Sequence, residues 1–386
     1  MTGSPLALYI HWPFCASKCP YCDFNSHVRD QIDIAAWAHS YHAELQYWAA
    51  LTTERPIHSI FFGGGTPSLM PASLVERILT TIHDGWSVDP GCEITLEANP
   101  GSVEQAKFMD FRNSGVNRVS IGVQSLDDAV LKFLGRRHTA AEARQAVGVA
   151  AQVFERFSFD LIYARPDQTL DQWQAELGEA LTFAPKHLSL YQLTIEENTG
   201  FYTAYQRGDF VMPDDELAGA FYELTQDLTA ARGLPAYEIS NHAAPGHESR
   251  HNLTYWRYDD YLGIGPGAHG RVTLGPQRYA TRTVRTPEAW LKAVAAQGHG
   301  LSEQTALVPE EMAQEYLLMG LRILSGIAAE DFLKKTGRAL MDVCSPTACA
   351  TLEDAGFITW DGHTLRATAA GRQRLSSVLQ HLVARS

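Results

Sequence analysis

Short apolar runs alternate with amphipathic segments along the first two thirds of the chain, and this alternation limits the possible folds more than any other feature. The apolar runs are rich in β-branched and aromatic residues, as buried strands are, and they cover residues 8–12, 59–62, 93–96, 118–123, 157–162 and 187–193. The segments between them, such as 73–85 and 139–154, show the apolar spacing of helices. The repeat predicts an α/β fold, either an open doubly wound sheet or a complete or partial barrel with its helices outside.

Glycine or polar residues follow one predicted strand after another. They are Cys15, the Gly-Gly-Gly-Thr segment 63–66, Glu97, Gln124 and Asp160. In both architectures the chemistry collects at the carboxyl ends of the strands. Because so many strand ends carry such residues, one shared site at the top of a barrel is favoured over a crevice between two loops. We therefore predict a barrel of the TIM type, complete or partial, built from the six strand-like runs.

After about residue 200 the repeat fades, and the rest of the chain divides into two further parts. Strand-like runs near 236–240 and 271–273 flank a glycine- and histidine-rich segment. The pattern then becomes helical (312–324 and 328–336), followed by an apolar run to Trp360, a turn at 361–362 and a last helix over 367–383. Helices followed by a two-stranded wing predict a small winged-helix-like module. The three predicted domains are a barrel (1–200), an α+β extension (201–300) and the C-terminal module (301–386).

Composition excludes several classes of protein. The chain has 44 acidic and 31 basic residues, a net charge of -13, which argues against a wide nucleic-acid footprint. We therefore interpret the C-terminal module as a packing or lid domain, not a DNA-binding one. No apolar run reaches the roughly 18 residues of a membrane span, and no basic segment with an apolar signal core begins the chain. We expect a cytoplasmic protein with no transmembrane segment and no nucleic-acid partner.

Six cysteines in 386 residues are too few for a disulfide framework, and three of them lie within eight positions. The remaining three are interpreted as ordinary buried thiols: Cys92, Cys344 and Cys349. The spacing of Cys15, Cys19 and Cys22 brings three thiolates round one loop, where they can hold three corners of a cubane iron–sulfur cluster and leave the fourth iron open. A closed zinc site needs a fourth ligand, which His11 could supply, but this spacing is not the paired geometry common in zinc sites.

The cysteine motif resembles that of the radical S-adenosylmethionine (SAM) enzymes. The resemblance implies a [4Fe-4S] cluster whose open iron is chelated by the amine and carboxylate of SAM, so that the missing fourth cysteine marks where the cofactor binds. It also implies an electron donor to the cluster and reductive cleavage of SAM to a deoxyadenosyl radical. For the fold, it implies that the barrel is a partial (β/α)6 barrel of the TIM type. The protein supplies binding, orientation and electronic tuning.

Further residues are assigned to SAM through this resemblance. The Gly63–Pro67 segment, "GGGTP", is implied to bind the methionyl group through Gly64, Gly65 and Thr66, since glycines allow close approach and exposed amides can bind a carboxylate. Glu97 stands where a carboxylate would accept both ribose hydroxyls. From the residues alone the other positions are only polar strand ends or aromatics near the cysteines; the family implies cofactor contacts for Tyr9, Tyr21, Gln124, Arg136 and Asp160.

Within these enzymes the chain is most similar to the oxygen-independent coproporphyrinogen III oxidase family and its HemW branch of heme chaperones. The motifs that carry the similarity are "LYIHWPFC", "GGGTP", "SIGVQS", "DLIY", "LYQLTIEENT" and "GIGPGAHG". The oxidases have a further cysteine where this chain has Phe24. The segment 251–256, "HNLTYW", resembles the H-N-x-x-Y-W motif of the heme-binding branch.

The resemblance implies heme binding through His251, since imidazole is a common axial ligand and aromatic rings offer flat surface to a macrocycle. His242, His247 and His269 lie in the same part of the sequence, so the choice of iron ligand stays open. The leading hypothesis is a heme chaperone that passes heme to an acceptor protein; the family implies respiratory enzymes as acceptors and a heme-dependent homodimer.

Two alternatives remain at this point. One is an oxygen-independent coproporphyrinogen III oxidase or another radical SAM oxidoreductase, because the cofactor machinery is intact. The other is a structural cluster protein without radical chemistry. We expect a radical SAM protein that is not a coproporphyrinogen III oxidase, because Phe24 replaces the oxidase cysteine.

Overall fold

Six strand–helix units build the first half of the protein, as predicted. The computed structural model describes residues 4–102 and 104–383. The strands are β1 (Leu6–Trp12), β2 (Ile57–Gly64), β3 (Val88–Ala98), β4 (Arg118–Gln124), β5 (Arg156–Tyr163) and β6 (His187–Gln192). The helices α1 (Ile34–Thr52), α2 (Ala72–Gly85) and α3 (Gln105–Asn113) follow β1, β2 and β3. Two helices, α4 (Asp128–Phe133) and α5 (Ala140–Val153), follow β4, and α6 (Leu170–Thr182) follows β5. Short 3-10 turns lie at Pro67–Leu69 and Pro100–Ser102.

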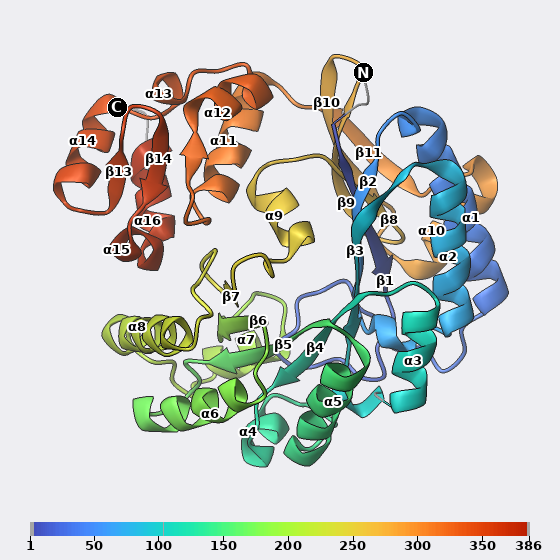
Figure 1. Cartoon of the computed structure of the whole chain (residues 1–386), viewed down its shortest axis with the longest axis horizontal. Helices are drawn as coiled ribbons and strands as arrows, with labels where there is room; N and C mark the ends of the chain where they lie inside the picture. Colours follow the sequence, from blue (N-terminus) through green and yellow to red (C-terminus); the bar gives the residue numbers. More distant parts are fainter. Residues whose placement is uncertain (1–3, 103, 384–386) are drawn as a thin grey trace.

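The strands join one eleven-stranded sheet in the order β11-β10-β9-β8-β1-β2-β3-β4-β5-β6-β7. Neighbouring strands from β1 to β6 are parallel, and β8 (Tyr261–Ile264) pairs parallel to β1 on its other side. The two ends of the sheet do not pair with each other, so the barrel is partial. Figure 1 shows α1 and α2 on the outer side of the sheet and α9 (Arg250–Trp256) on its hollow inner side.

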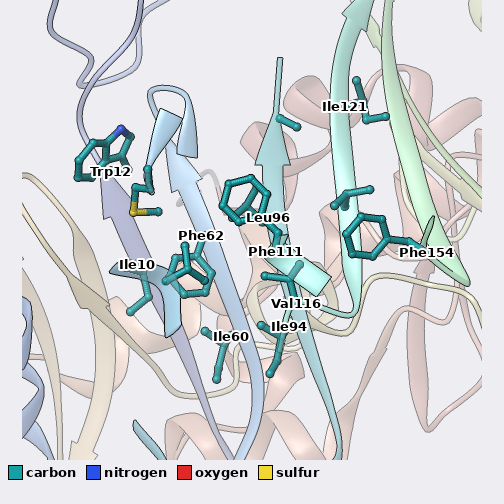
Figure 2. Packing of buried hydrophobic residues seen from close by; sticks show 14 of the residues in the cluster. Ile10, Trp12, Ile60, Phe62, Ile94, Leu96, Phe111, Val116, Ile121 and Phe154 are labelled. Carbon is teal, nitrogen blue, oxygen red and sulfur yellow. The ribbon is translucent and has the colours of Figure 1, made fainter. Parts of the chain in front are cut away.

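The alternation of side chains along each strand separates the core from the site. Residues such as Ile10, Ile60, Leu96 and Ile121 point outward and pack under the helices with Phe111 (Figure 2). Burying each such side chain contributes roughly 1.5–3 kcal/mol. The alternate residues of the same strands face inward, because a strand has a period of two. Polar residues can therefore line the hollow side without interrupting the core.

Local signals explain where several helices begin. Thr139 and Glu142 form a capping box at the start of α5, and Thr169 and Gln172 form one at the start of α6. The Asp33 side chain accepts from the Ala36 amide at the start of α1. Such caps each contribute about 0.5–2 kcal/mol by satisfying backbone N–H groups that have no partner within the helix.

The middle of the chain continues the same sheet. Its further elements are α7 (Gly200–Gln206), α8 (Asp215–Ala231), β7 (Asn241–Ala243), β9 (His269–Leu274), β10 (Gln277–Thr283), α10 (Pro287–Gln297) and β11 (Leu301–Ala306). The strand predicted near 271–273 is confirmed within β9. The strand predicted near 236–240 is wrong. Ala236 makes only an isolated bridge with His242. Residues 237–240 bend, because the Glu238 carboxylate accepts from the Ser240 amide (2.8 Å), and β7 begins at Asn241.

The C-terminal part has a core of its own around Leu317, Phe332, Ile358 and Leu365. Its elements are α11 (Pro309–Gly320), β12 (Ile327–Ala328), α12 (Ala329–Thr336), α13 (Leu340–Val343), α14 (Pro346–Asp354), β13 (Ile358–Trp360), β14 (Thr364–Ala367), α15 (Ala369–Gln373) and α16 (Leu375–Val383). The β13–β14 hairpin with its turn at 361–362 is confirmed, but β12 makes the small sheet three-stranded. The single helix predicted over 367–383 is wrong, because Ala367 ends β14 and the helix breaks at Arg374.

The domain boundaries at 200 and 300 stay predictions, although strands β8 to β11 share the sheet of the barrel. Cys92, Cys344 and Cys349 are buried free thiols, as expected. Over residues 4–102 and 104–383, no helix combines the length and the apolar character that a membrane crossing requires.

Candidate cofactor and ligand site

A cavity of about 1890 Å³ lies at the carboxyl ends of the parallel strands. Its wall brings together eleven of the thirteen residues that the sequence assigned to the site. They are Cys15, Cys19, Tyr21, Cys22, Gly64, Gly65, Thr66, Glu97, Gln124, Arg136 and Asp160. The two others, Tyr9 and His251, do not line this cavity. The expected single site at the top of the barrel is therefore present for most of the predicted residues.

The three cysteines lie half-buried in the loop that follows β1. The ends of this loop are held together, since the Cys15 amide donates to the His27 carbonyl (2.9 Å) and the His27 amide donates to the Pro13 carbonyl (2.7 Å). In the described chain, no three His, Cys, Asp or Glu side chains are placed to share one metal ion. A cubane cluster takes one thiolate per iron, so its thiolates need not converge on one ion.

Two side chains donate hydrogen bonds to these sulfurs. The Thr66 hydroxyl lies 3.4 Å from the Cys15 sulfur, and the Arg136 guanidinium lies 3.6 Å from the Cys19 sulfur. Both contacts favour a thiolate, whereas burial raises the pKa of the Cys15 and Cys22 thiols. Burial favours the neutral thiol and the hydrogen bonds favour the thiolate. A metal centre that replaces the thiol protons satisfies both, so the three cysteines of this loop are suited to ligate iron.

His11 does not fit the zinc alternative. Its Nδ1 lies 3.0 Å from the Tyr9 hydroxyl, and its Nε2 lies 2.9 Å from the Asn25 carbonyl oxygen. Both ring nitrogens are therefore paired within the fold, and burial lowers the His11 pKa to about 4. A fourth zinc ligand from this residue would require one of these contacts to break.

Glycine is required at positions 64 and 65 because the backbone there passes close to β1 and the cysteine loop. A Cβ at Gly64 would lie 2.5 Å from the His11 ring, and one at Gly65 would lie 2.6 Å from the Phe14 carbonyl oxygen. Gly64 also has a φ of +110°, where other residues are strained. The amides of Gly65 and Thr66 donate to backbone carbonyls of the preceding unit (2.7 and 2.8 Å). The expectation that these amides are free to bind a carboxylate is therefore wrong, because each already donates within the chain.

Glu97 and Asp160 present carboxyl groups on the inner face of β3 and β5. The Gly64 amide donates to Glu97 Oε2 (3.2 Å), so this third amide of the glycine segment is also occupied. Burial and then the charge of Asp160 raise the Glu97 pKa to about 8, and burial raises the Asp160 pKa to about 6. Glu97 is therefore mostly neutral at pH 7 in the ligand-free protein, and hydroxyl donors would favour its charged form.

Arg136 connects the cysteine loop to the end of β4. Its Nη2 donates to the Gly122 carbonyl (2.7 Å), and its Nη1 lies 3.4 Å from the Tyr21 hydroxyl as well as near Cys19. Its Nε is buried without a partner among the described residues. Gln124, at the end of β4, has a φ of +70°, which turns the chain at the cavity wall. These contacts place one fixed cation beside the thiols.

A second, smaller cavity of about 510 Å³ adjoins the first, and Asp23, Phe24, Gly64 and Glu97 line both. Tyr9 lines this smaller cavity, with its hydroxyl bonded to His11. The remaining wall residues are His11, Asn25, Tyr255, Tyr261, Gly267, Ala268, His269, Arg282 and Arg285. Sequence reasoning did not assign Arg282 or Arg285, although "GIGPGAHG" at 263–270 marked the glycine-rich loop after β8.

His251 is placed differently from the expectation of an open iron ligand. Its ring stacks on Phe61 (centroids 4.9 Å apart), and 1% of the residue is exposed. Its Nδ1 lies 3.1 Å from the Ser59 hydroxyl, and its Nε2 lies 2.7 Å from the Tyr255 hydroxyl. Burial lowers its pKa to about 3, so the ring is neutral. A heme-binding role for His251 stays a prediction, and in this conformation neither nitrogen faces a cavity.

Replacing Glu97 by glutamine is expected to stabilise the ligand-free protein at pH 8 while weakening SAM binding. The folded carboxyl has a pKa of about 8 against 4.5 for an ordinary glutamate, so ionisation opposes folding. The difference between variant and wild type is absent below about pH 4.5, grows as the pH rises, and reaches about 1–3 kcal/mol at pH 8 after allowance for partial solvent contact. Denaturant unfolding at pH 5 and pH 8 measures it. An equal difference in unfolding free energy at both pH values would contradict the raised pKa of Glu97. Glu104→Gln, at an exposed position, is the control and should show no such pH dependence.

Comparison with known proteins places these features in a family. The model of the radical SAM superfamily matches residues 9–178, and that of the HemN C-terminal domain matches residues 307–374. The heme chaperone HemW of Escherichia coli is 37% identical over 387 residues, covering 98% of this chain and 98% of that protein. The mitochondrial radical S-adenosyl methionine domain-containing protein 1 of Bos taurus is also 37% identical, over 98% of this chain and 87% of that protein.

A solved structure supports the fold. The coproporphyrinogen III oxidase HemN of Escherichia coli superposes with a TM-score of 0.82 at 20% identity, covering 98% of this chain and 90% of that one. The partial barrel and the C-terminal module are therefore those of this group, as expected. At 37% identity over nearly the whole length of its HemW relative, the chain belongs to the HemW family of radical SAM proteins.

Proposed function

We propose that this protein is a heme chaperone that binds a [4Fe-4S] cluster, SAM and heme, and transfers heme to an acceptor protein. The observation that carries the proposal is the near full-length match to proteins named heme chaperone HemW, at 37% identity in Escherichia coli and in Haemophilus influenzae.

In this proposal Cys15, Cys19 and Cys22 ligate three irons. Residues of both cavities hold SAM, with Tyr9 in the smaller one. Glu97 accepts from the ribose, and the Gly64–Gly65 backbone gives the methionyl group room to approach. Arg136 keeps a positive charge beside the thiolates. When bound, the cluster and SAM together supply a route to a deoxyadenosyl radical. A cytoplasmic location, also proposed, would keep the cysteines reduced for cluster assembly.

The acceptor and the other partners belong to the proposal as well. A respiratory enzyme is the acceptor that the family suggests, an electron donor would reduce the cluster, and heme binding would favour a homodimer. The acceptor is tested by asking whether a tagged, heme-loaded protein copurifies with membranes more than its heme-free form does. Size-exclusion chromatography with and without heme tests the homodimer.

The test of the function is a heme titration of the anaerobically reconstituted protein, followed by visible absorption. A saturable Soret shift near one heme per chain is the expected result. Absence of a shift with a normal cluster spectrum would overturn the chaperone proposal. An anaerobic assay with reductant and coproporphyrinogen then tests the oxidase alternative, because neither decarboxylated product nor deoxyadenosine should form if the protein only carries heme.

Replacing His251 by alanine is expected to weaken heme binding about tenfold or more without changing cluster content. The imidazole holds the Tyr255 hydroxyl at the wall of the smaller cavity and packs on Phe61. Its loss leaves Ser59 and Tyr255 without their partner, and a buried unpaired group costs about 1–3 kcal/mol. The Soret titration and iron analysis measure both effects. Thr225→Ala, a buried control distant from this site in the sequence, should leave heme affinity unchanged. Unchanged heme affinity in His251→Ala would show that His251 is not part of the heme site.

A further inference from the structure

The inner face of the barrel carries a layer of polar side chains below the cavity wall. Strand pairing sets Ser120 of β4 directly beside Ser158 of β5. Side chains two residues apart in a strand share one face, so Arg118 lies on the same face as Ser120, and Asp160 lies on the same face as Ser158. Ser120 and Asp160 line the larger cavity, whereas Arg118 and Ser158 do not. Arg118 therefore stands one step below the wall that the sequence assigned to SAM.

Arg118 is a buried cation without a carboxylate partner. Only 3% of the residue is exposed, and it makes no ion pair with any residue that the structure describes. Its Nη1 lies 3.4 Å from the Thr95 hydroxyl, and its Nη2 donates to the Ser158 hydroxyl at 3.1 Å. The arginine beside it in the ladder, Arg156, pairs with the Glu93 carboxylate at 3.0 Å. A buried charge without such a pair is costly, so the position of Arg118 needs an explanation.

A chain of hydrogen bonds leads from Arg118 to the cavity wall. The Ser158 hydroxyl lies 2.8 Å from the Ser120 hydroxyl, and the Ser120 hydroxyl donates to Asp160 Oδ1 at 3.3 Å. Because the guanidinium donates to Ser158, each hydroxyl of the chain can donate one step closer to the carboxylate. A chain in this direction favours the charged form of the carboxyl group at its end. The charge of Arg118 acts in the same direction on Asp160 and on Glu97.

The other ionisable groups that face this layer keep their charge state near pH 7. Burial lowers the pKa of two histidines and raises the pKa of four tyrosines, so all six are neutral: His187, His251, Tyr9, Tyr191, Tyr237 and Tyr255. The Arg156–Glu93 ion pair lies beside Arg118, and the Arg136 guanidinium faces Asp160. The groups that titrate here are therefore the carboxyls of Asp160 and Glu97, which repel each other when charged and titrate as a pair.

We infer that Arg118 is a positioning residue for SAM binding: through Ser158 and Ser120 it keeps one negative charge on the Asp160–Glu97 pair at the cavity wall. The inference rests on the proposed function, in which these carboxyls contact SAM, and adds the residue that prepares them. Arg118 does not line the cavity and acts only through the pair. Two buried carboxyls that repel each other would otherwise take up protons, and a protonated carboxyl is a weaker acceptor for hydroxyl donors.

The experiment measures the SAM affinity of the full-length, cluster-reconstituted and unreduced protein from pH 6 to pH 9 by anaerobic equilibrium dialysis. For Arg118→Met we expect an affinity about tenfold weaker at pH 7, as a rise of about one unit in the pKa of the pair implies, and an approach to the wild-type affinity at pH 9. Arg118→Lys retains the charge and should restore most of the binding. Arg77→Met removes an exposed arginine on α2 and is the matched control, which should follow the wild type at every pH. The amine of SAM titrates equally in all variants, so only differences between them matter.

A second measurement follows the carboxyl pair without SAM. Infrared spectroscopy of the ligand-free protein detects the C=O stretch of protonated carboxyl groups, and Asp160→Asn identifies the contribution of the pair. In Arg118→Met this band should persist to a pH about one unit higher than in the wild type. Ser158→Ala breaks the chain but leaves the arginine in place, so it should shift the band in the same direction by a smaller amount, and it serves as the test if Arg118→Met does not fold.

Two results would overturn the inference while the proposed function stands. One is an infrared band that does not move in Arg118→Met or, if that variant does not fold, in Ser158→Ala. The other is a loss of SAM affinity that is equal at every pH, which would make Arg118 a purely structural residue. A wild-type protein that binds no SAM would overturn the proposed function and the inference together.

Discussion

Serine in place of Cys19 is expected to abolish the cluster. The sulfur lies in the wall of the larger cavity and accepts from Arg136 at 3.6 Å. A serine hydroxyl is not a thiolate ligand for iron at neutral pH, and three cysteines leave no spare ligand in this loop. Iron should fall from about four atoms per chain to fewer than one, and the broad charge-transfer absorbance should disappear. Iron and sulfide analysis measures the iron loss, and a visible absorption spectrum measures the loss of absorbance.

Cys92→Ser provides the matched control, since Cys92 is a buried free thiol on β3 away from the cysteine loop. It should keep full iron content and the same absorbance. Far-UV circular dichroism on both variants separates loss of the cluster from loss of the fold. A Cys19→Ser protein that keeps a full cluster would show that the loop cysteines are not the iron ligands.

The second large effect is expected for alanine at Gly64. The new Cβ would lie 2.5 Å from the His11 ring, which is held by Tyr9 and Asn25, and the backbone φ of +110° suits glycine alone. The loop must shift, which moves its contact with Glu97. We expect SAM affinity to fall about a hundredfold or more, and the free energy of unfolding to fall by about 1–3 kcal/mol. Anaerobic equilibrium dialysis and denaturant unfolding measure the two effects.

Gly148→Ala is its control, because a Cβ at this position in α5 meets nothing within 4 Å. In a helix interior alanine is favoured over glycine by roughly 0.5–1 kcal/mol, so this variant should be slightly more stable and bind SAM normally. Normal SAM binding by Gly64→Ala would mean that the glycine segment is needed only for folding.

Local patterns predicted the strands and most of the cofactor wall. The apolar positions of β1 to β6 recur with the strand period, so the residues between them, such as Glu97 and Asp160, had to face the opposite side. Parallel strands end at one edge, which brings these side chains together with the cysteine loop. The Cys15, Cys19 and Cys22 spacing needed no tertiary information, since all three lie in one loop.

The strand errors have local causes that propensity does not register. The apolar run at 236–240 bends because a single buried carboxylate, that of Glu238, binds the backbone of its own turn. The last helical segment begins later than predicted because Ala367 pairs with Ile358 in the small sheet. In both places a contact made by the folded chain outweighed the intrinsic preference of the segment.

The sequence by itself determined the repeat, the inward and outward faces of the strands, and the cysteine, glycine and acidic residues of the cofactor wall. Only the tertiary structure decided that β8 pairs with β1, that Phe24 and Arg285 line one cavity, and that His251 is enclosed while His269 is open. The physical reason is the distance along the chain over which each signal acts. Periodicity and spacing act within a single element, whereas the exposure of a histidine depends on which distant segments cover it and on the hydrogen bonds that they offer to its ring.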